Sequence, residues 1–155
     1  MATLKVGNKV PDFSLPMTGG GTWSLKEAAG RKLVIYFYPR DMTSGCTREA
    51  QDFRDRYGAL RKAGVQLVGI SRDPVAMHDK FTAKESLPFP LLADTDEKVC
   101  KLFDVIKQKS LYGRKYLGVE RSTFLVDGTG RLQQEWRKVK VPGHAEEVLE
   151  AARRL

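Results

Sequence analysis

Two apolar runs separated by a helical pattern constrain the fold of this chain more than any other feature. KLVIYFY (32–38) is apolar on both of its alternating faces, and VQLVGIS (65–71) is a second such run. Strands of this kind are buried on both sides in sheets covered by helices. The segment between them carries one apolar helical face, formed by Ala50, Phe53, Tyr57 and Leu60. Strand, helix and strand predict two parallel strands joined by a right-handed crossover.

The rest of the chain alternates in the same way. Helices are expected in SLKEAAG (24–30), DPVAMHDKFTAKES (73–86), DEKVCKLFDV (96–105) and GHAEEVLEAARRL (143–155). Strands are expected in FPLLAD (89–94) and in STFLVDGTGRLQQEW (122–136), which reads as a hairpin turning at residues 127–130. MTGGGTW (17–23) reads as a turn between two short strands. The pattern predicts an α/β protein with a mixed central sheet flanked by helices.

Length and composition favour one soluble domain spanning residues 1–155. The chain is 41% hydrophobic and 30% charged, as in ordinary globular proteins. No apolar run approaches the ~18 residues of a membrane helix, so no membrane association is expected. The first residues, MATLKVGNKVPDF, lack the apolar core of a signal peptide, and the cytoplasm is the expected compartment.

A net charge of +8 raises the question of nucleic-acid binding. The densest basic region is KQKSLYGRKYLGVER (107–121), but elsewhere basic residues alternate with acidic ones. The sequence has no zinc-ligand spacing, no aromatic RNA-binding motif and no clear helix-turn-helix pattern. We therefore interpret the charge as a solvated basic face and expect no nucleic-acid partner.

Cys46 is one of only two cysteines, and its position favours a reactive thiol over a structural one. It precedes Ala50 by four residues and Phe53 by seven, in phase with the inner face of the predicted helix. It should therefore point inward from the first helical turn, just beyond the C-terminal end of a buried strand. Ligand sites of open α/β sheets gather at that edge, and a helix N-terminus favours an anion there.

The free energy needed to ionise the Cys46 thiol at neutral pH shows which neighbouring groups the site requires. A thiol with the ordinary pKa of ~8.5 is only about 3% ionised at pH 7, and lowering that value to ~6 takes about 3.4 kcal/mol. A helix terminus supplies only ~0.3–2 kcal/mol, so a cation is also needed. Arg121 is the candidate, because its strand should run antiparallel to the strand that precedes Cys46. It could pair with Glu49 and still donate to the sulfur.

Pro39, Thr43 and Cys46 form the pattern P-x-x-x-T-x-x-C, and with Glu49 and RSTFLVD (121–127) this closely resembles the peroxiredoxins. The setting YFYPRDMTSGCTREAQDFRD (36–55) is most similar to their Q-type branch, the bacterioferritin comigratory proteins. The resemblance extends from VGNKVPDFSLP (6–16) through PFPLLAD (88–94) to YGRKYLGVERSTFLVD (112–127), nearly the whole chain.

The resemblance implies a thioredoxin-like fold with an N-terminal β extension and a peroxidase that needs no metal or organic cofactor. In this family the sulfur of Cys46 would attack a hydroperoxide and become a sulfenic acid. Thr43 would hold the peroxide and Pro39 would shield the pocket. Arg121 would stabilise the sulfur anion and the departing oxygen, and Glu49 would orient Arg121. Tyr36 or Tyr38 would line the approach.

The chain departs from its family where many members carry a second cysteine, five residues after the first. Gln51 stands there, so the intrahelical route to a disulfide is closed. Cys100 is read as a structural cysteine, with resolution of the sulfenic acid as the alternative. We expect single-cysteine turnover with thioredoxin, glutaredoxin or glutathione as reductant, in a monomer or a homodimer.

Two other functions compete with this interpretation. A thioredoxin-like thiol–disulfide oxidoreductase would share the fold, but the chain has no C-x-x-C motif. A non-catalytic, chaperone-like module would not need Thr43, Cys46 and Arg121 together. His78 and His144 are expected at the surface with no metal partner, and Trp23 and Trp136 are expected to serve packing.

Overall fold

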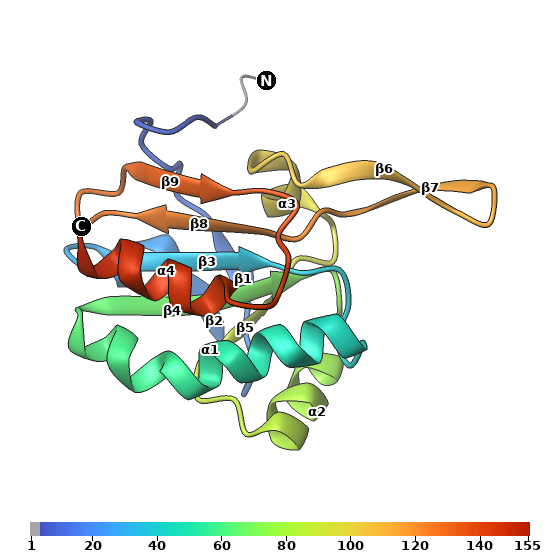
Figure 1. The fold of residues 1–155 in the computed structure, drawn as a ribbon, viewed down its shortest axis with the longest axis horizontal. Coiled ribbons are helices and arrows are strands. Elements are labelled where there is room, and N and C mark those ends of the chain that lie inside the picture. Colours follow the sequence, from blue (N-terminus) through green and yellow to red (C-terminus); the bar gives the residue numbers. More distant parts are fainter. Residues whose placement is uncertain (1–3) are drawn as a thin grey trace.

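A five-stranded mixed sheet organises the protein (Figure 1). In the computed structural model, which describes residues 4–155, the strands lie in the order β5-β4-β3-β8-β9. They are β3 (Lys32–Phe37), β4 (Val65–Ser71), β5 (Leu91–Ala93), β8 (Ser122–Val126) and β9 (Leu132–Trp136). β3, β4 and β5 are parallel, β8 is antiparallel to β3, and β9 is antiparallel to β8. The mixed sheet and the hairpin at 127–130 are thus as the sequence predicts.

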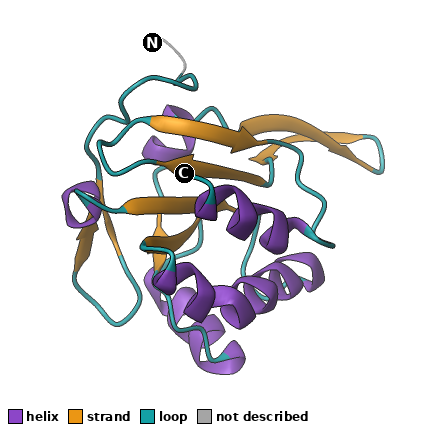
Figure 2. Cartoon of the chain, turned by 60° about the vertical axis from the view of Figure 1, so that its left-hand side comes forward, coloured by secondary structure: helices purple, strands orange, loops and turns teal. Residues whose placement is uncertain are grey.

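Three helices cover one face of this sheet: α1 (Ser44–Lys62), α2 (Val75–Glu85) and α4 (His144–Arg153). Figure 2 shows them gathered on one side of the strands. α1 joins β3 to β4, as the strand–helix–strand pattern predicts. Its inner side chains pack with Val34 and Tyr36 of β3 in one buried cluster. None of the helices in residues 4–155 is both long and apolar enough to cross a membrane.

The opposite face is covered by smaller elements. They are the hairpin of β1 (Ser14–Pro16) and β2 (Thr22–Ser24), the 3-10 turn η1 (Leu25–Ala28) and α3 (Lys98–Leu102). Leu33, Ile35 and Phe37 alternate with the α1-facing residues of β3 and point into this second cluster. The helix expected at 24–30 is therefore a single 3-10 turn, in which Glu27 accepts a hydrogen bond from the Ser24 amide at 2.8 Å.

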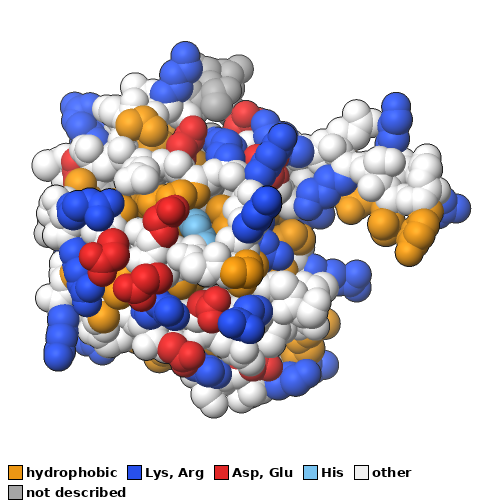
Figure 3. All heavy atoms as spheres, viewed as in Figure 1, with side chains coloured by type: hydrophobic (Ala, Val, Ile, Leu, Met, Phe, Trp, Pro, Cys, Tyr) orange, Lys and Arg blue, Asp and Glu red, His pale blue; other side chains and the backbone are white. Residues whose placement is uncertain are grey.

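The basic region at 107–121 forms a hairpin that the sequence pattern did not reveal. β6 (Ile106–Leu111) and β7 (Arg114–Val119) are antiparallel and project from the body (Figure 1). Tyr112 and Gly113 turn the chain with φ of 51° and 77°, as a two-residue hairpin turn requires. Figure 3 shows Lys and Arg side chains along the projection, beside exposed apolar ones. The basic face is solvated, as expected.

Candidate active site

Cys46 lies in the first turn of α1 and is buried, with 1% of its surface exposed. The loop of residues 38–43 connects the end of β3 to this helix. Thr43 is the N-cap residue with extended backbone angles, and its carbonyl accepts the first helical hydrogen bond, from Thr47, at 2.8 Å. The sulfur therefore sits where the phase of the apolar stripe predicts, next to the free amides of a helix start.

Arg121 approaches Cys46 from the start of β8, the strand that lies next to β3. β8 pairs antiparallel to β3 with Ser122 opposite Phe37, so the residue before Ser122 reaches the end of β3 that leads to the cysteine. The Arg121 Nη2 lies 3.4 Å from the Cys46 Sγ, and Nη1 donates to Glu49 Oε1 at 2.7 Å. One guanidinium group thus contacts both the thiol and the carboxylate, as the sequence argument expects.

The Arg121–Glu49 pair is largely buried, and burial governs its charge. Desolvation raises the pKa of Glu49 to about 7, although the nearby Arg121 works in the opposite direction. Burial also opposes the charge of Arg121, but Glu49 and Cys46 outweigh it and raise the pKa of the guanidinium. Glu49 Oε2 and the Tyr36 hydroxyl are buried without a hydrogen-bond partner among residues 4–155. Arg121 therefore stays positively charged beside the sulfur.

Thr43 and Pro39 lie on the same loop, which precedes Cys46 in the chain. Pro39 is half-buried and Thr43 is exposed, with its hydroxyl donating to the Arg40 carbonyl at 2.9 Å. The exposed hydroxyl faces no side-chain partner in the described chain and can exchange its bond for one to a small polar molecule. The loop therefore offers a hydroxyl donor in the segment that leads from β3 to Cys46.

Two residues at this site escaped the sequence analysis. Gly45 leaves room for Arg121, because a Cβ atom there would lie 3.2 Å from Nη2. Lys109 of β6 donates to the Val119 carbonyl at 2.6 Å. Burial and the neighbouring Arg121 lower the pKa of Lys109, while Cys46 opposes that shift, so the lysine is a second cation in the same electrostatic field. The sequence signal that could have pointed to Gly45 is its position directly before Cys46.

Cys100 lies on the other side of the sheet. It is fully buried in α3 and belongs to the cluster of Leu33 and Ile35, whereas Cys46 belongs to the cluster of Val34 and Tyr36. Its amide donates to Asp94 Oδ2 at 2.7 Å. Burial, reinforced by Asp94, raises the pKa of the Cys100 thiol far above its ordinary value. The central sheet therefore separates the two sulfur atoms.

The expected surface location of the two histidines is wrong. His144 is 6% exposed and hydrogen-bonded to Thr123 Oγ1 at 2.8 Å, and burial lowers its pKa to about 4. His78 is fully buried, and its ring nitrogens contact Asp41 and the Leu92 carbonyl. A polar residue on an inner helical face is accommodated when partners from other elements satisfy it.

His78 also lies nearer to possible metal ligands than expected. Ligand atoms of Asp41, Asp73 and His78 are within 4.8 Å of one another. Each of the three side chains already makes hydrogen bonds to protein groups, however, among them Ser71 to Asp73 at 2.6 Å. The three residues form a closed hydrogen-bonded network, with no nitrogen of the histidine left as a free ligand.

Residues 6–135 match the AhpC/TSA family. The chain belongs to the AhpC/TSA family. The peroxiredoxin Bcp of Xanthomonas campestris pv. campestris is 49% identical over 97% of this chain and 94% of its own length. The peroxiredoxin Bcp of Bacillus subtilis is 47% identical over 96% and 94%.

A solved structure of the X. campestris bacterioferritin comigratory protein superposes with a TM-score of 0.90 and 46% identity. The match covers 99% of this chain and 98% of that one, and the structure concerns alkyl peroxide reduction by the X. campestris protein. The resemblance to Q-type peroxiredoxins, the thioredoxin-like fold and the thiol peroxidase function are thereby confirmed for this family member.

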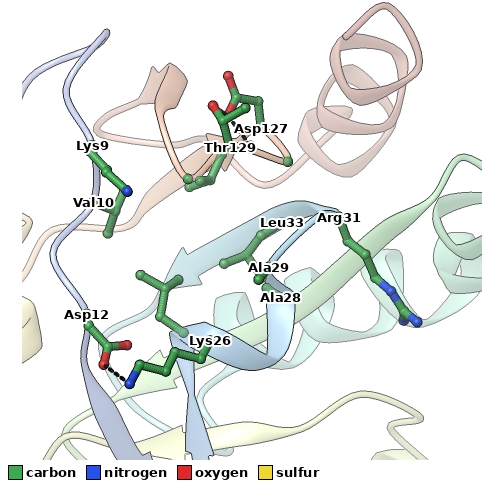
Figure 4. Close-up of a pocket in the computed structure, with 14 residues that line it drawn as sticks. Lys9, Val10, Asp12, Lys26, Ala28, Ala29, Arg31, Leu33, Asp127 and Thr129 are labelled. Atoms are coloured by element: carbon green, nitrogen blue, oxygen red, sulfur yellow. Dashed lines mark hydrogen bonds and ion pairs between the residues drawn. The ribbon is translucent and has the colours of Figure 1, made fainter.

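The peroxidase also has an apolar hollow of about 290 Å³ that is remote from Cys46 (Figure 4). It is lined by residues at the start of β3, the end of β8 and the N-terminal segment, including Leu33, Val126 and Val10. Because Cys46 follows the opposite end of β3, this hollow is not part of the candidate site around the thiol. Lys26 and Asp12 at its rim form an exposed ion pair of 4.0 Å, which contributes little to stability.

Proposed function

We propose that Cys46 is the peroxidatic residue of this peroxidase and that hydroperoxides are its substrates. The thiolate attacks the nearer peroxide oxygen, forming an S–O bond as the O–O bond breaks. The departing oxygen takes up a proton and leaves as an alcohol or as water, and the sulfur remains as sulfenic acid. The 3.4 Å contact between Arg121 Nη2 and the sulfur is the observation that carries this proposal.

Arg121 acts on charge at two stages. In the free protein its guanidinium stabilises the sulfur anion, and during attack it faces the oxygen on which negative charge develops. Glu49 fixes the orientation of the guanidinium through the 2.7 Å ion pair, so the second nitrogen stays directed at the sulfur. Donors that are already oriented lower the barrier more than donors that must turn during the reaction.

Thr43 and Pro39 complete the pocket from the loop. The Thr43 hydroxyl binds the peroxide by exchanging its hydrogen bond to the Arg40 carbonyl, and the helix-start amides assist. The half-buried Pro39 ring limits access of water to the sulfur. The site thus needs only the sulfur, one cation and a small set of hydrogen-bond donors.

The sulfenic acid is reduced by a thiol from outside the chain. Gln51, where many relatives have a cysteine, instead donates to Glu85 Oε1 of α2 at 2.8 Å. Cys100 would have to cross the sheet to reach Cys46. Thioredoxin, glutaredoxin and glutathione are the candidate donors, and a reducing compartment such as the cytoplasm would supply them.

Intact-mass measurement tests the proposal. After one equivalent of hydrogen peroxide, the protein should gain one oxygen, and dimedone should trap that form as an adduct at Cys46. Cys46→Ser should show neither product, whereas Cys100→Ser should behave like the unsubstituted protein. A Cys46→Ser variant that consumes peroxide at the original rate would overturn the assignment. Reduction of insulin disulfides would instead support the thiol–disulfide exchange function.

A further inference from the structure

Asp41 has an unusual number of strong contacts for a loop residue. It lies between β3 and α1, two residues after Pro39 and two before Thr43, and is 5% exposed. Its amide donates to Asp73 Oδ2 at 2.9 Å, and its Oδ1 accepts from the Tyr38 hydroxyl at 2.5 Å. Its Oδ2 lies 2.6 Å from Nδ1 of His78. One residue thus ties the loop to α2 and to Asp73 in the β4–α2 connection, and also binds the Tyr38 side chain at the start of the loop.

The protons of His78 follow from its two partners. Nε2 lies 2.9 Å from the Leu92 carbonyl, which can only accept, so Nε2 carries a hydrogen. Nδ1 faces the Asp41 carboxylate, so a second proton is held between that nitrogen and Oδ2. The other polar groups at this point are the Tyr38 hydroxyl, 3.4 Å from Nδ1, and the Asp73 carboxylate on the Asp41 amide. The buried pair is therefore neutral as a whole and fully hydrogen-bonded.

The loop needs such an anchor. Met42, directly after Asp41, has φ of 65°, a conformation that costs a non-glycine residue energy. Such a conformation persists only where surrounding contacts enforce it. Asp41 is held by His78 of α2, and His78 in turn is bound to the Leu92 carbonyl of β5, so the anchor rests on regular elements that do not share the freedom of a loop.

We propose that Asp41 and His78 are positioning residues, which hold the loop of residues 39–43 in the geometry that receives the peroxide. The inference rests on the proposed function. Neither residue contacts the sulfur, and both act through Thr43 and Pro39. Disrupting the pair should therefore slow the reaction with peroxide, which uses the loop. It should not slow reaction of the sulfur with an electrophile that does not use the loop.

Two rate constants separate these effects: oxidation of Cys46 by hydrogen peroxide and its alkylation by iodoacetamide. For His78→Leu and for Asp41→Ala we expect peroxide oxidation to fall about 10- to 100-fold, the range that a misplaced contact produces. Alkylation should stay within about threefold, because Arg121 and the helix start are untouched. Global destabilisation would instead change both rates together.

Asp41→Asn is the rescue variant. Its amide nitrogen can donate to Nδ1 of a neutral His78, while its oxygen still accepts from Tyr38, so the loop stays anchored without the shared proton. Peroxide oxidation should stay within about threefold of that of the unsubstituted protein. Phe81→Leu is the matched control on α2, since it removes buried packing near Tyr38 and leaves the hydrogen bonds in place.

The outcomes separate the two hypotheses. If Asp41→Ala oxidises as fast as Asp41→Asn, or if both reagents slow equally in Asp41→Ala, the positioning role is wrong. The comparison at residue 41 decides the matter even where His78→Leu does not fold. If the unsubstituted protein shows no Cys46-dependent oxidation at all, it is the proposed function that fails.

Discussion

Arg121 divides its guanidinium between two partners, Glu49 at 2.7 Å through one nitrogen and Cys46 at 3.4 Å through the other. Both contacts depend on the planar fork of arginine, which holds its donors at a fixed separation. An ammonium group has the same charge but one centre, so it can occupy one of these positions well and not both. The site is therefore sensitive to geometry as well as to charge.

Arg121→Lys should accordingly be a poor replacement. We expect the rate of Cys46 oxidation by hydrogen peroxide to fall about 10²- to 10³-fold, the cost of losing one oriented donor at a developing charge. Stopped-flow fluorescence or competition kinetics would measure it. Arg131→Lys, at an exposed residue just before β9, is the control and should leave the rate unchanged. A rate within threefold of the original in Arg121→Lys would show that charge alone suffices.

Glu49 should make stability depend on pH. Its pKa rises on folding from the ordinary 4.5 to about 7, so between these values the folded state binds more protons than the unfolded state. The contribution is complete below pH 4.5 and is lost as pH rises through 7, a change of about 3 kcal/mol.

Denaturant unfolding of the protein and of Glu49→Gln between pH 4.5 and 8 measures this contribution as a difference. His144 contributes the opposite slope, because its pKa falls on folding from 6.5 to about 4. Subtracting the two variants cancels that slope. A difference that does not change with pH would contradict the burial argument for Glu49.

Thr43→Val should remove the hydroxyl while keeping the branched shape. We expect the oxidation rate of Cys46 by peroxide to fall about 10- to 100-fold, since a hydrogen-bonding partner of the substrate is lost. Thr43→Ser keeps the hydroxyl and should retain most of the rate. Equal rates for the two variants would exclude a substrate contact through this hydroxyl.

Gly45→Ala tests the space beside Arg121. The added Cβ would lie 3.2 Å from Nη2, closer than ordinary contact, so the guanidinium must shift by a few tenths of an ångström. Peroxide oxidation should slow about tenfold, while helix propensity alone would make the variant more stable by up to about 1 kcal/mol. Gly58→Ala, whose Cβ meets no neighbour in the same helix, is the control for stability. An unchanged oxidation rate would mean that Arg121 adapts without loss.

Cys100→Ala should leave turnover unaffected with any external thiol donor. The cost should be confined to stability, about 1 kcal/mol or somewhat more for a small cavity in a close-packed cluster. Peroxide turnover assays with thioredoxin and with glutathione would test it, together with non-reducing mass analysis for an internal disulfide. Loss of turnover after a normal first oxidation would assign Cys100 the resolving role.

The sequence was sufficient to predict the Cys46–Arg121–Glu49 arrangement for a physical reason. Helical phase fixes the direction of Cys46 and Glu49, and the antiparallel course of β8 fixes the edge that Arg121 reaches. Both are properties of single elements or of adjacent strands. Local pattern therefore contained the required information.

His78 was misread because its partners are not local. Asp41 and Leu92 lie 37 and 14 residues away in the chain, and nothing in the α2 sequence announces them. The β6–β7 hairpin was missed because its residues are mostly exposed, so it lacks the alternation that marks a half-buried strand. The Tyr112–Gly113 turn was its one local signal.

The sheet that places Cys46 in one buried layer and Cys100 in the other also decides where oxidising equivalents go. An oxidising equivalent taken up by Cys46, as proposed, would meet no second cysteine in its own buried cluster among residues 4–155. We therefore expect each catalytic cycle to end with reduction of Cys46 by a thiol donor from solution. The rate of reduction would then depend on how accessible the Cys46 sulfenic acid becomes to that donor.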